Sequence, residues 1–274
     1  MSEPLLDVPP LLDVQGVSVR FGGLTAVDDA RFAVEQGRVT GLIGPNGAGK
    51  TTLFNVITGL QAPTSGRVLL DGEDITDWAP QERARRGIAR TFQRLEVFGS
   101  LSVFDNVLTA AELRRGWTRD KQDPREVAAR AIARVGVGGY ADAMADAVPT
   151  GVARLVELAR ALALQPRLLL LDEPSSGLSE QETHAFAELL RDVVADGGSV
   201  LLVEHDVDLV MGLCQTLHVL DFGRVICSGP PATVQADPAV QAAYLGVVDP
   251  EPVAPRTPHA TPTPTASERN ALCR

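Results

Sequence analysis

The chain has 274 residues, 45% of them hydrophobic and 22% charged, which is typical of a globular protein with one full core or a core with an added lobe. No apolar run approaches the ~20 residues that cross a bilayer, and the first ten residues lack the basic and apolar regions of a secretory signal, so we expect a cytoplasmic protein. The formal net charge of -10 argues against a general nucleic-acid binder, and the spacing of Cys214, Cys227 and Cys273 predicts neither a disulfide framework nor a zinc site.

The first predicted elements are two edge strands. Apolar side chains alternate with others along Leu12 to Phe21, as in a strand with one buried face. Ala30 to Val34 is a second strand-like run, so we expect an antiparallel pair. Phe21 ends the first strand, directly before two glycines. Its ring either stacks on a purine or lies in the core, and the sequence alone leaves both interpretations open.

The next stretch predicts a phosphate-binding loop. It follows a short buried strand, Val39 to Ile43, and precedes an apolar helix around Leu53 to Ile57 whose positive end would face the same phosphates. The pattern G-x-x-x-x-G-K-[ST] supplies glycines where the backbone curls, a lysine that reaches phosphates and a hydroxyl that binds Mg2+. A chance match is disfavoured because the chain has only two lysines, Lys50 and Lys121, against 23 arginines. The loop residues are Gly44, Pro45, Asn46, Gly47, Ala48, Gly49, Lys50, Thr51 and Thr52.

After this loop we expect a strand, a short helix and another strand. They cover Gly66 to Asp71, Pro80 to Arg86, and Ile88 to Phe92, which leaves Gln93 at the exit of the last strand. From residue 94 to about residue 150 the sequence pattern becomes helical, and polar or glycine-containing segments separate the helical stretches. This segment predicts a helical lobe inserted into an α/β core. Its helical patterns run over Val103 to Leu113 and Arg125 to Val135.

A leucine-rich strand brings two acids to the edge of the predicted sheet. It follows a strongly helical stretch, Gly151 to Leu164, and runs from Leu168 through Leu171 into Asp172 and Glu173. Such a run is typical of a central parallel strand that is buried on both faces, and ligands bind at the carboxyl edge of sheets of this kind. Ser179 then opens a capping box that predicts a helix to about Ala195.

The remaining elements complete the core. Ser199 to Val203 is the next buried strand, and His205 stands just after its end. Thr216 to Asp221 and Arg224 to Ser228 fit a terminal hairpin, with short helices continuing to Leu245. Residues 247–274 are rich in Pro, Thr and Ala, and their low apolar content predicts a disordered tail, as we also expect flexibility in residues 1–10.

The polar residues at these strand ends form a constellation suited to hydrolysis of a phosphoanhydride. Lys50 and the loop amides would neutralise the β and γ phosphates, while Thr51 would ligate Mg2+ and Asp172 would hold that ion. Glu173 is the candidate base that polarises the attacking water, and His205 would stabilise the γ-phosphate or orient Glu173. An Asp-Glu pair alone is a weak signal, since strands often end in acids. Its combination with Lys50 is strong.

From Leu11 to about Gly246 the chain resembles an ATP-binding cassette (ABC) ATPase, the nucleotide-binding subunit of an ABC transporter. The resemblance implies an α/β fold with a mainly parallel P-loop core sheet, an antiparallel β subdomain and the inserted helical lobe, with ATP and Mg2+ as cofactors. It also implies that Gln93 contacts Mg2+ and links the nucleotide to membrane subunits, and that Phe21 stacks on adenine. Besides the phosphate loop, the matching motifs are Thr91-Phe92-Gln93, Leu168 to Pro174, Ser175 to Leu178, and Glu204-His205-Asp206.

A finer resemblance is to the cassettes of branched-chain amino acid importers. Lipopolysaccharide-export cassettes share part of the pattern, and a cassette does not touch the cargo, so the substrate is assigned by analogy. The implied partners are a second cassette, transmembrane permeases and, indirectly, a substrate-binding protein, at the cytoplasmic face of the plasma membrane. The matching stretches are Phe21 to Leu24, Thr58-Gly59 with Pro63-Thr64, Ile88 to Gln93, Glu204 to Met211, and Ala243 to Gly246.

The signature motif of the family is altered. Where related chains carry Leu-Ser-Gly-Gly-Gln or Leu-Ser-Tyr-Gly-Gln, this chain has Val148-Pro149-Thr150-Gly151-Val152. Pro149 offers neither hydroxyl nor N-H, and losing one hydrogen bond to a charged group costs ~1.5 to 3 kcal/mol, or roughly ten- to hundredfold in affinity. The hypothesis is a heterodimer with two unequal ATP sites. The alternative is that Gly151 and the helix N-terminus bind the partner's nucleotide unaided.

Two functions other than a transport ATPase are compatible with an ABC cassette. The altered signature allows a regulatory cassette that binds ATP and scarcely hydrolyses it, but the presence of Glu173 and His205 argues against one. Soluble ABC ATPases of translation or DNA repair usually carry two cassettes or long coiled coils, and the sequence has neither. The leading prediction is therefore an ATP-hydrolysing transport subunit that binds no nucleic acid.

Overall fold

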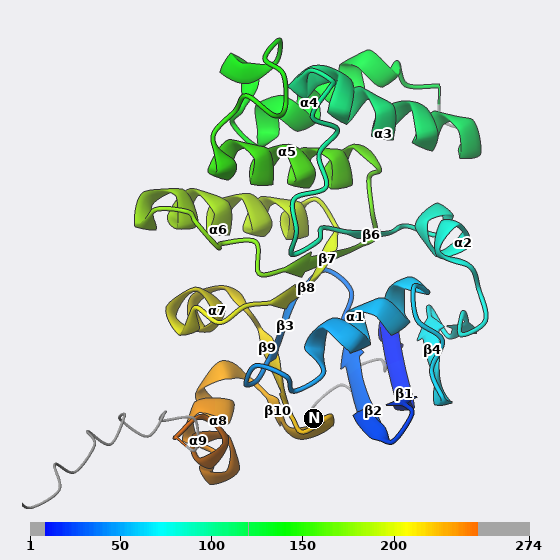
Figure 1. Cartoon of the computed structure of the whole chain (residues 1–274), viewed down its shortest axis with the longest axis vertical. Helices are drawn as coiled ribbons and strands as arrows, with labels where there is room; N and C mark the ends of the chain where they lie inside the picture. Colours follow the sequence, from blue (N-terminus) through cyan, green and yellow to red (C-terminus); the bar gives the residue numbers. More distant parts are fainter. Residues whose placement is uncertain (1–8, 120, 246–274) are drawn as a thin grey trace, which may run out of the picture.

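The computed structural model describes residues 9–119 and 121–245, and the predicted disordered tail lies outside them. Figure 1 shows two sheets in the lower half of the molecule and a stack of helices above them. The four-stranded sheet has the order β2-β1-β4-β5, and the six-stranded sheet has the order β10-β9-β3-β8-β7-β6. This is the predicted architecture, with a mainly parallel core sheet, an antiparallel subdomain and a helical lobe.

The antiparallel sheet is built on the first predicted strand pair. β1 (Leu12–Phe21) pairs with β2 (Leu24–Val34) on one side and with β4 (Ser65–Leu70) on the other, and β5 (Glu73–Asp74) adds a short edge. β2 begins at Leu24, six residues before the predicted start, because the chain turns back at Gly22 and pairs at once with the end of β1.

The six-stranded sheet brings the predicted strand ends together. β3 (Val39–Ile43) and β8 (Ser199–Val203) have the predicted bounds, and β7 (Leu168–Asp172) lies beside β8. All five residues of β7 and of β8 are buried, as the apolar runs predicted. β3, β8, β7 and β6 run parallel, so their carboxyl ends share one edge.

The two outer parts of this sheet differ from each other. β9 (Thr216–Asp221) runs parallel to β3 and forms the predicted terminal hairpin with β10 (Arg224–Gly229). β6 (Ile88–Arg90) is shorter than predicted, although the Thr91 amide still donates to the Leu170 carbonyl at 3.0 Å. The chain therefore leaves the sheet before Phe92, and Gln93 stands in a loop.

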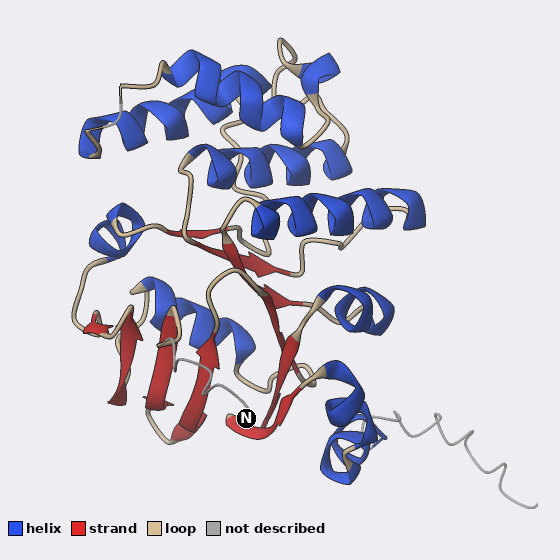
Figure 2. Cartoon of the chain, turned by 180° about the vertical axis from the view of Figure 1, so that it is seen from behind, coloured by secondary structure: helices blue, strands red, loops and turns tan. Residues whose placement is uncertain are grey.

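Helices α3, α4 and α5 stack at one end of the molecule, and α6 lies between that stack and the sheet (Figures 1 and 2). Ser179 and Glu182 form the predicted capping box at the start of α6. The helices are α1 (Lys50–Thr58), α2 (Pro80–Arg85), α3 (Val103–Trp117), α4 (Pro124–Arg134), α5 (Thr150–Ala163), α6 (Glu180–Ala195), α7 (Val207–Leu213), α8 (Pro231–Ala236) and α9 (Pro238–Leu245), with a 3-10 turn at Gly138–Tyr140.

Two buried apolar clusters hold these layers together. One joins the helical stack, α6 and α7 to one face of the six-stranded sheet, and the other joins α1 and the antiparallel sheet to its opposite face. Leu169 and Leu171 belong to the first cluster and Leu168 and Leu170 to the second, so β7 is covered on both sides. In the part of the chain that the structure describes, no helix is long and apolar enough to span a membrane.

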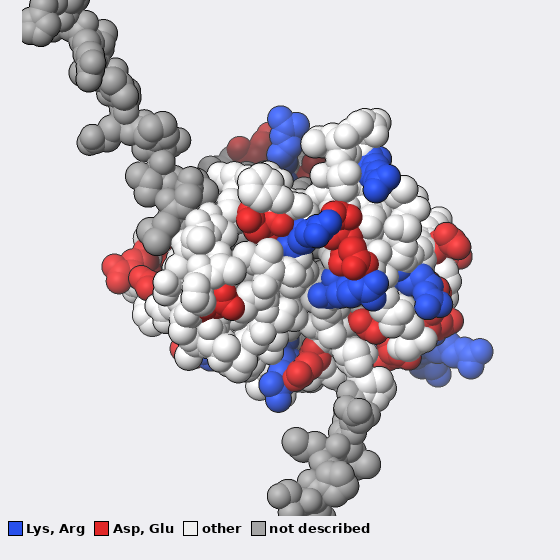
Figure 3. Space-filling model, turned by 90° about the horizontal axis from the view of Figure 1, so that it is seen from below, with Lys and Arg blue, Asp and Glu red and all other residues white. Residues whose placement is uncertain are grey.

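Charge is mixed over the face shown in Figure 3. Acidic and basic side chains are interspersed there, and no basic stripe of the kind that tracks a nucleic-acid backbone is visible on it.

Candidate functional site

The loop that follows β3 requires glycine at two positions where backbone passes close by. Gly44 has φ 151°, and a Cβ there would lie 2.0 Å from the Leu220 carbonyl oxygen. Gly49 has φ 107°, and its Cβ would lie 2.5 Å from the Ala26 carbonyl oxygen. Any side chain at these positions would push the loop away from β2 and β9, so the two glycines let the loop form against the sheet.

Lys50 is the first residue of α1 and is bonded within the loop. Its Nζ donates to the carbonyl oxygens of Gly44 at 2.6 Å and Pro45 at 2.9 Å. Burial lowers the pKa of Lys50, while the nearby carboxylates of Glu173 and Asp172 raise it. Lys50 therefore lies close enough to Glu173 and Asp172 for their charges to act on it.

Asp172, at the end of β7, is 1% exposed and pairs with a buried arginine. Arg90 Nη2 lies 2.9 Å from Asp172 Oδ2, and Arg90 Nη1 donates to Asn55 Oδ1 of α1 at 2.6 Å. The guanidinium lies over the rings of Phe54 and Phe92, at 5.3 and 5.0 Å. Burial raises the pKa of Asp172, and Arg90 opposes that shift. Sequence reasoning did not single out Arg90, which lay inside the predicted strand Ile88 to Phe92.

Glu173 sits on strained backbone in contact with Gln93. Its φ is 49°, a left-handed value that a non-glycine residue rarely adopts, and its amide donates to the Val203 carbonyl at 2.9 Å. Gln93 Nε2 donates to Glu173 Oε2 at 3.1 Å. Gln93, which is 80 residues away in the sequence, therefore contacts Glu173 directly after the end of β7.

His205 is exposed and its neighbour Glu204 is buried. The Glu204 side chain is inaccessible, with Oε1 accepting the Ser175 amide at 2.7 Å and Oε2 accepting the His205 amide at 3.2 Å. The His205 ring nitrogen Nδ1 lies 3.8 Å from Glu204 Oε2, and 70% of its side chain is exposed. Glu204, which sequence reasoning mentioned only as part of a motif, therefore ties the loop after β7 to the loop after β8.

Two predicted site residues lie at the periphery. Phe21 ends β1 with 49% of its surface exposed, so it is not a core aromatic and its ring is available for stacking. Gly151 lies in the first turn of α5, beside Leu178 and Glu182. None of its nearest neighbours belongs to residues 44–52, so this chain does not bring Gly151 to its own phosphate loop.

The oxygen atoms at this edge suit a magnesium ion that arrives with phosphates. No group of three or more His, Cys, Asp and Glu side chains suited to hold a metal occurs among the described residues. Mg2+ is commonly bound by one or two carboxylates together with substrate phosphates. Asp172 ends β7, Thr51 lies in the first turn of α1 and Gln93 lies in the loop after β6. Their carboxylate, hydroxyl and amide oxygens are ligands of the class that Mg2+ prefers, so these residues fit the ion.

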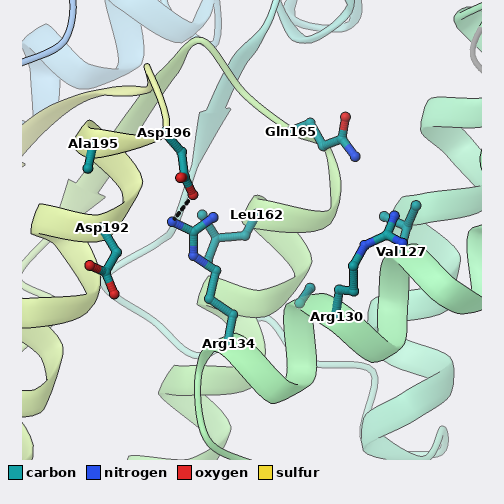
Figure 4. Close-up of a pocket in the computed structure, with 9 residues that line it drawn as sticks. Val127, Arg130, Arg134, Leu162, Gln165, Asp192, Ala195 and Asp196 are labelled. Carbon is teal, nitrogen blue, oxygen red and sulfur yellow. Dashed lines mark ion pairs between the residues drawn. The ribbon is translucent and has the colours of Figure 1, made fainter.

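A separate pocket of about 450 Å³ lies between α4, α5 and α6 (Figure 4). Arg134 Nη2 pairs with Asp196 Oδ2 across it at 2.7 Å, which joins the helical stack to the end of α6. Its lining contains none of the residues of the phosphate loop or of the acids after β7. It is therefore not the nucleotide site.

Comparisons with known proteins agree with this geometry. Residues 27–176 match the family model described as ABC transporter, and residues 224–250 match the model of the branched-chain amino acid ATP-binding cassette transporter.

Two curated relatives and one solved structure resemble the chain over most of its length. The high-affinity branched-chain amino acid transport ATP-binding protein BraF of Pseudomonas aeruginosa is 36% identical over 250 residues, with 86% of this chain and 98% of BraF covered. The lipopolysaccharide export system ATP-binding protein LptB of Acidithiobacillus ferridurans is 36% identical over 236 residues, with 86% of this chain and 97% of LptB covered. The ADP conformation of MJ1267, an ATP-binding cassette of an ABC transporter, superposes with a TM-score of 0.78 at 31% identity, over 87% of this chain and 99% of that one.

Proposed function

The chain belongs to the ATP-binding subunits of ABC transporters, in the branched-chain amino acid branch, and we propose that it powers import of branched-chain or related amino acids. The observation that carries the proposal is the edge of the six-stranded sheet. There the carboxylates of Asp172 and Glu173 act electrostatically on Lys50, and Gln93 donates a hydrogen bond to Glu173. As a member of this family the chain binds ATP and couples its hydrolysis to transport.

Each side chain of the site has a separate role in the proposed hydrolysis of ATP. Lys50 and the loop amides neutralise the phosphates, and a bound Mg2+ would supply further positive charge to the leaving phosphate oxygens. Thr51 and Asp172 would hold that ion, and Arg90 fixes the Asp172 carboxylate. Glu173 is the base that orients the attacking water, and the strained backbone at this residue presets its direction.

A groove beside Gln93 is the proposed contact with the permeases. It has a volume of about 200 Å³ and lies between residues 90–98, α3 and α5. Exposed apolar side chains gather on it, namely Phe92, Phe98 and Leu113. Since a subunit of a transporter must meet membrane-embedded partners, we assign this groove to an apolar segment of a permease.

The altered signature supports an unequal pair of ATP sites. Pro149 is the N-cap of α5 and provides no side-chain cap, and Thr150 and Gly151 follow it in the first turn. A helix N-terminus attracts phosphate through its free amides, but the Ser hydroxyl and Gln side chain found in related signatures are missing here. We propose that this end of α5 forms the weaker site of a heterodimer, while Lys50, Glu173 and His205 work against a partner's intact signature.

The signature proposal is tested by restoring the family residues. The double substitution Pro149→Ser and Val152→Gln in the assembled transporter should raise ATPase activity roughly ten- to hundredfold if the weak site limits turnover. An unchanged rate would show that Gly151 and the helix N-terminus suffice.

The hydrolytic role is tested with Glu173→Gln, which keeps the side-chain shape and removes the base. The variant should bind ATP and accumulate as ATP-bound dimers with little turnover, measured by gel filtration and phosphate release. Normal turnover would rule out Glu173 as the base. Lys50→Ala should abolish magnesium-dependent ATP binding itself.

Lipopolysaccharide export is the second candidate because LptB is also 36% identical. The match of residues 224–250 to the branched-chain amino acid model favours import. Identification of the permeases that co-purify with the chain from membranes distinguishes the two.

A further inference from the structure

Three charged side chains of α5 hold the segment of residues 92–98, which contains Gln93. Arg154 Nη1 donates to the Phe92 carbonyl at 3.2 Å, Glu157 Oε1 accepts the Glu96 amide at 2.5 Å, and Arg160 Nη1 donates to the Glu96 carbonyl. Positions 154, 157 and 160 are three residues apart and so lie on one side of the helix.

We propose that Arg154, Glu157 and Arg160 form a clamp that makes residues 92–98 move with α5. A permease segment seated on residues 92–98 would then shift the altered signature at the start of α5. The clamp residues are positioning residues, since they touch the loop and not the nucleotide. This inference rests on the proposed transport function and specifies how the groove acts.

The clamp holds the groove wall as well as the loop backbone. Residues 92–98 carry three exposed apolar side chains, Phe92, Leu95 and Phe98. The Arg160 guanidinium lies over the Phe98 ring at 4.4 Å from its centroid, a cation–π contact. The surface available to a partner is therefore fixed to α5 through the same arginine that binds the Glu96 carbonyl.

The burial of Glu157 makes this connection stiff. Glu157 is only 6% exposed, and burial raises its pKa, while the Glu96 amide and the charges of Arg154 and Arg160 oppose that shift and favour the carboxylate. A buried charge that loses its partners is strongly unfavourable. Separation of residues 92–98 from α5 would leave that carboxylate without its amide, so movement of the two as one unit is the cheaper change.

A small cavity extends the clamp to the end of β6. Thr91 Oγ1, Arg154 Nε and Glu157 Oε2 are buried without a hydrogen-bond partner among the described residues, and all three residues line one cavity of about 10 Å³. A cavity of that size holds about one water molecule, and a water there would have three polar partners. Thr91 follows β6 directly, so a bridging water would join the sheet to the clamp.

The clamp links two functional groups. Gln93 lies at one end of the held segment and donates to Glu173, the proposed base. Glu157 lies seven residues, or ~10 Å along the axis, from Thr150 at the start of α5. Displacement of residues 92–98 therefore reaches both the base and the signature.

The first test uses the isolated full-length chain. Glu157→Ala should accelerate hydrogen exchange of the Glu96 amide by about ten- to hundredfold, because the amide loses a charged acceptor. Glu126→Ala is the matched control, since Glu126 is an exposed carboxylate of the same helical stack and pairs across one turn with Arg130, at 3.7 Å. Equal exchange in both variants would overturn the clamp. Glu157→Gln keeps an acceptor oxygen and serves as the second variant if Glu157→Ala does not fold.

The second test uses the chain assembled with its co-purified permeases and its binding protein. Glu157→Ala should leave cargo-independent ATPase within about twofold and reduce cargo stimulation about tenfold or more, with Glu157→Gln intermediate and Glu126→Ala unchanged. Full stimulation in Glu157→Ala with a fast-exchanging Glu96 amide would assign the cluster a purely structural role and overturn the proposal. Absence of cargo stimulation in the unaltered transporter would contradict the proposed function, whereas the exchange experiment tests the clamp without it.

Discussion

Replacement of Arg90 by methionine is the sharpest test of how the Asp172 carboxylate is held. Arg90 and Asp172 form an ion pair at 2.9 Å whose side chains are 5% and 2% exposed. Arg90→Met keeps much of the packing against Phe54 and Phe92 and removes the charge. Removing one partner of a buried pair costs about 3 to 5 kcal/mol, because the other charge is left uncompensated. We expect a loss of unfolding free energy of about that size at pH 7.5, measured by urea denaturation.

Arg86→Met is the matched control for this substitution. Arg86 pairs with Glu73 at 3.3 Å, but both side chains are about half exposed. An exposed pair contributes about 0 to 1 kcal/mol. The two variants remove the same chemical group from positions four residues apart. The difference between their losses of unfolding free energy therefore measures the effect of burying the ion pair. Equal losses would refute the conclusion that the Arg90 pair holds a buried carboxylate.

The pH dependence provides a second check on Arg90→Met. Burial raises the pKa of Asp172 above its ordinary value of 3.8, and the loss of Arg90 removes the largest opposing effect. A carboxyl whose pKa is raised by folding binds its proton more tightly in the folded state, so its contribution to stability falls as pH rises through the window above 3.8. The cost of Arg90→Met should therefore be greatest at neutral pH and shrink toward pH 4, where the carboxyl becomes neutral. A cost that stayed constant over this range would contradict the assignment.

Three other predictions follow from buried groups. Arg83 is 2% exposed and donates to four backbone carbonyls, two of them at the end of α1, so Arg83→Met should lower the unfolding free energy by about 3 kcal/mol or more in urea denaturation. Burial raises the pKa of the Cys214 thiol to about 12, so a thiol reagent at pH 8 should label the native chain at Cys227 well before Cys214, as read by peptide mass spectrometry; rapid native labelling of Cys214 would show that the site opens. Burial lowers the pKa of His218, so the folded state resists its protonation and stability should fall as pH drops below its ordinary 6.5; His218→Phe should remove this part of the slope, and His205→Ala, at an exposed ring, should leave it in place.

The sequence predicted the parts of the fold that local patterns determine. The apolar runs at Val39–Ile43 and Ser199–Val203 gave strands with the observed bounds, since a buried parallel strand reads as an uninterrupted apolar stretch. The capping box at Ser179 marked the start of α6 because all its hydrogen bonds lie within one helical turn. The strand at Ile88 was predicted two residues too long. β7 continues to Asp172, but the chain leaves the sheet after Arg90, and the composition of residues 88–92 does not mark that point.

The polar contacts that organise the site depend on topology and were less predictable. Arg90 meets Asp172 from 82 residues away, and the Glu157 contact with Glu96 spans 61 residues. Nothing in the local pattern distinguishes Arg90 from the other arginines, since its burial follows from the adjacency of β6 and β7. The phosphate-binding loop could be predicted from its sequence pattern. The residues that position its neighbours, such as Arg90 and Glu157, could be identified only from the structure.

The contacts around the phosphate loop show how the site is prepared for a highly charged ligand. Lys50 donates to two loop carbonyls, Asp172 pairs with Arg90, and Glu173 accepts from Gln93, so each charged group has a partner within the chain. Binding of a triphosphate would then exchange the carbonyl partners of Lys50 for charged oxygens, and a hydrogen bond to a charged group contributes about 1.5 to 3 kcal/mol. Arg90 binds both Asp172 and Asn55, so a carboxylate held in this way need not be reoriented when the ion arrives. Little reorganisation remains to be done on binding, and this is the physical reason to expect that Arg90→Met weakens magnesium-dependent ATP binding even where the variant remains folded.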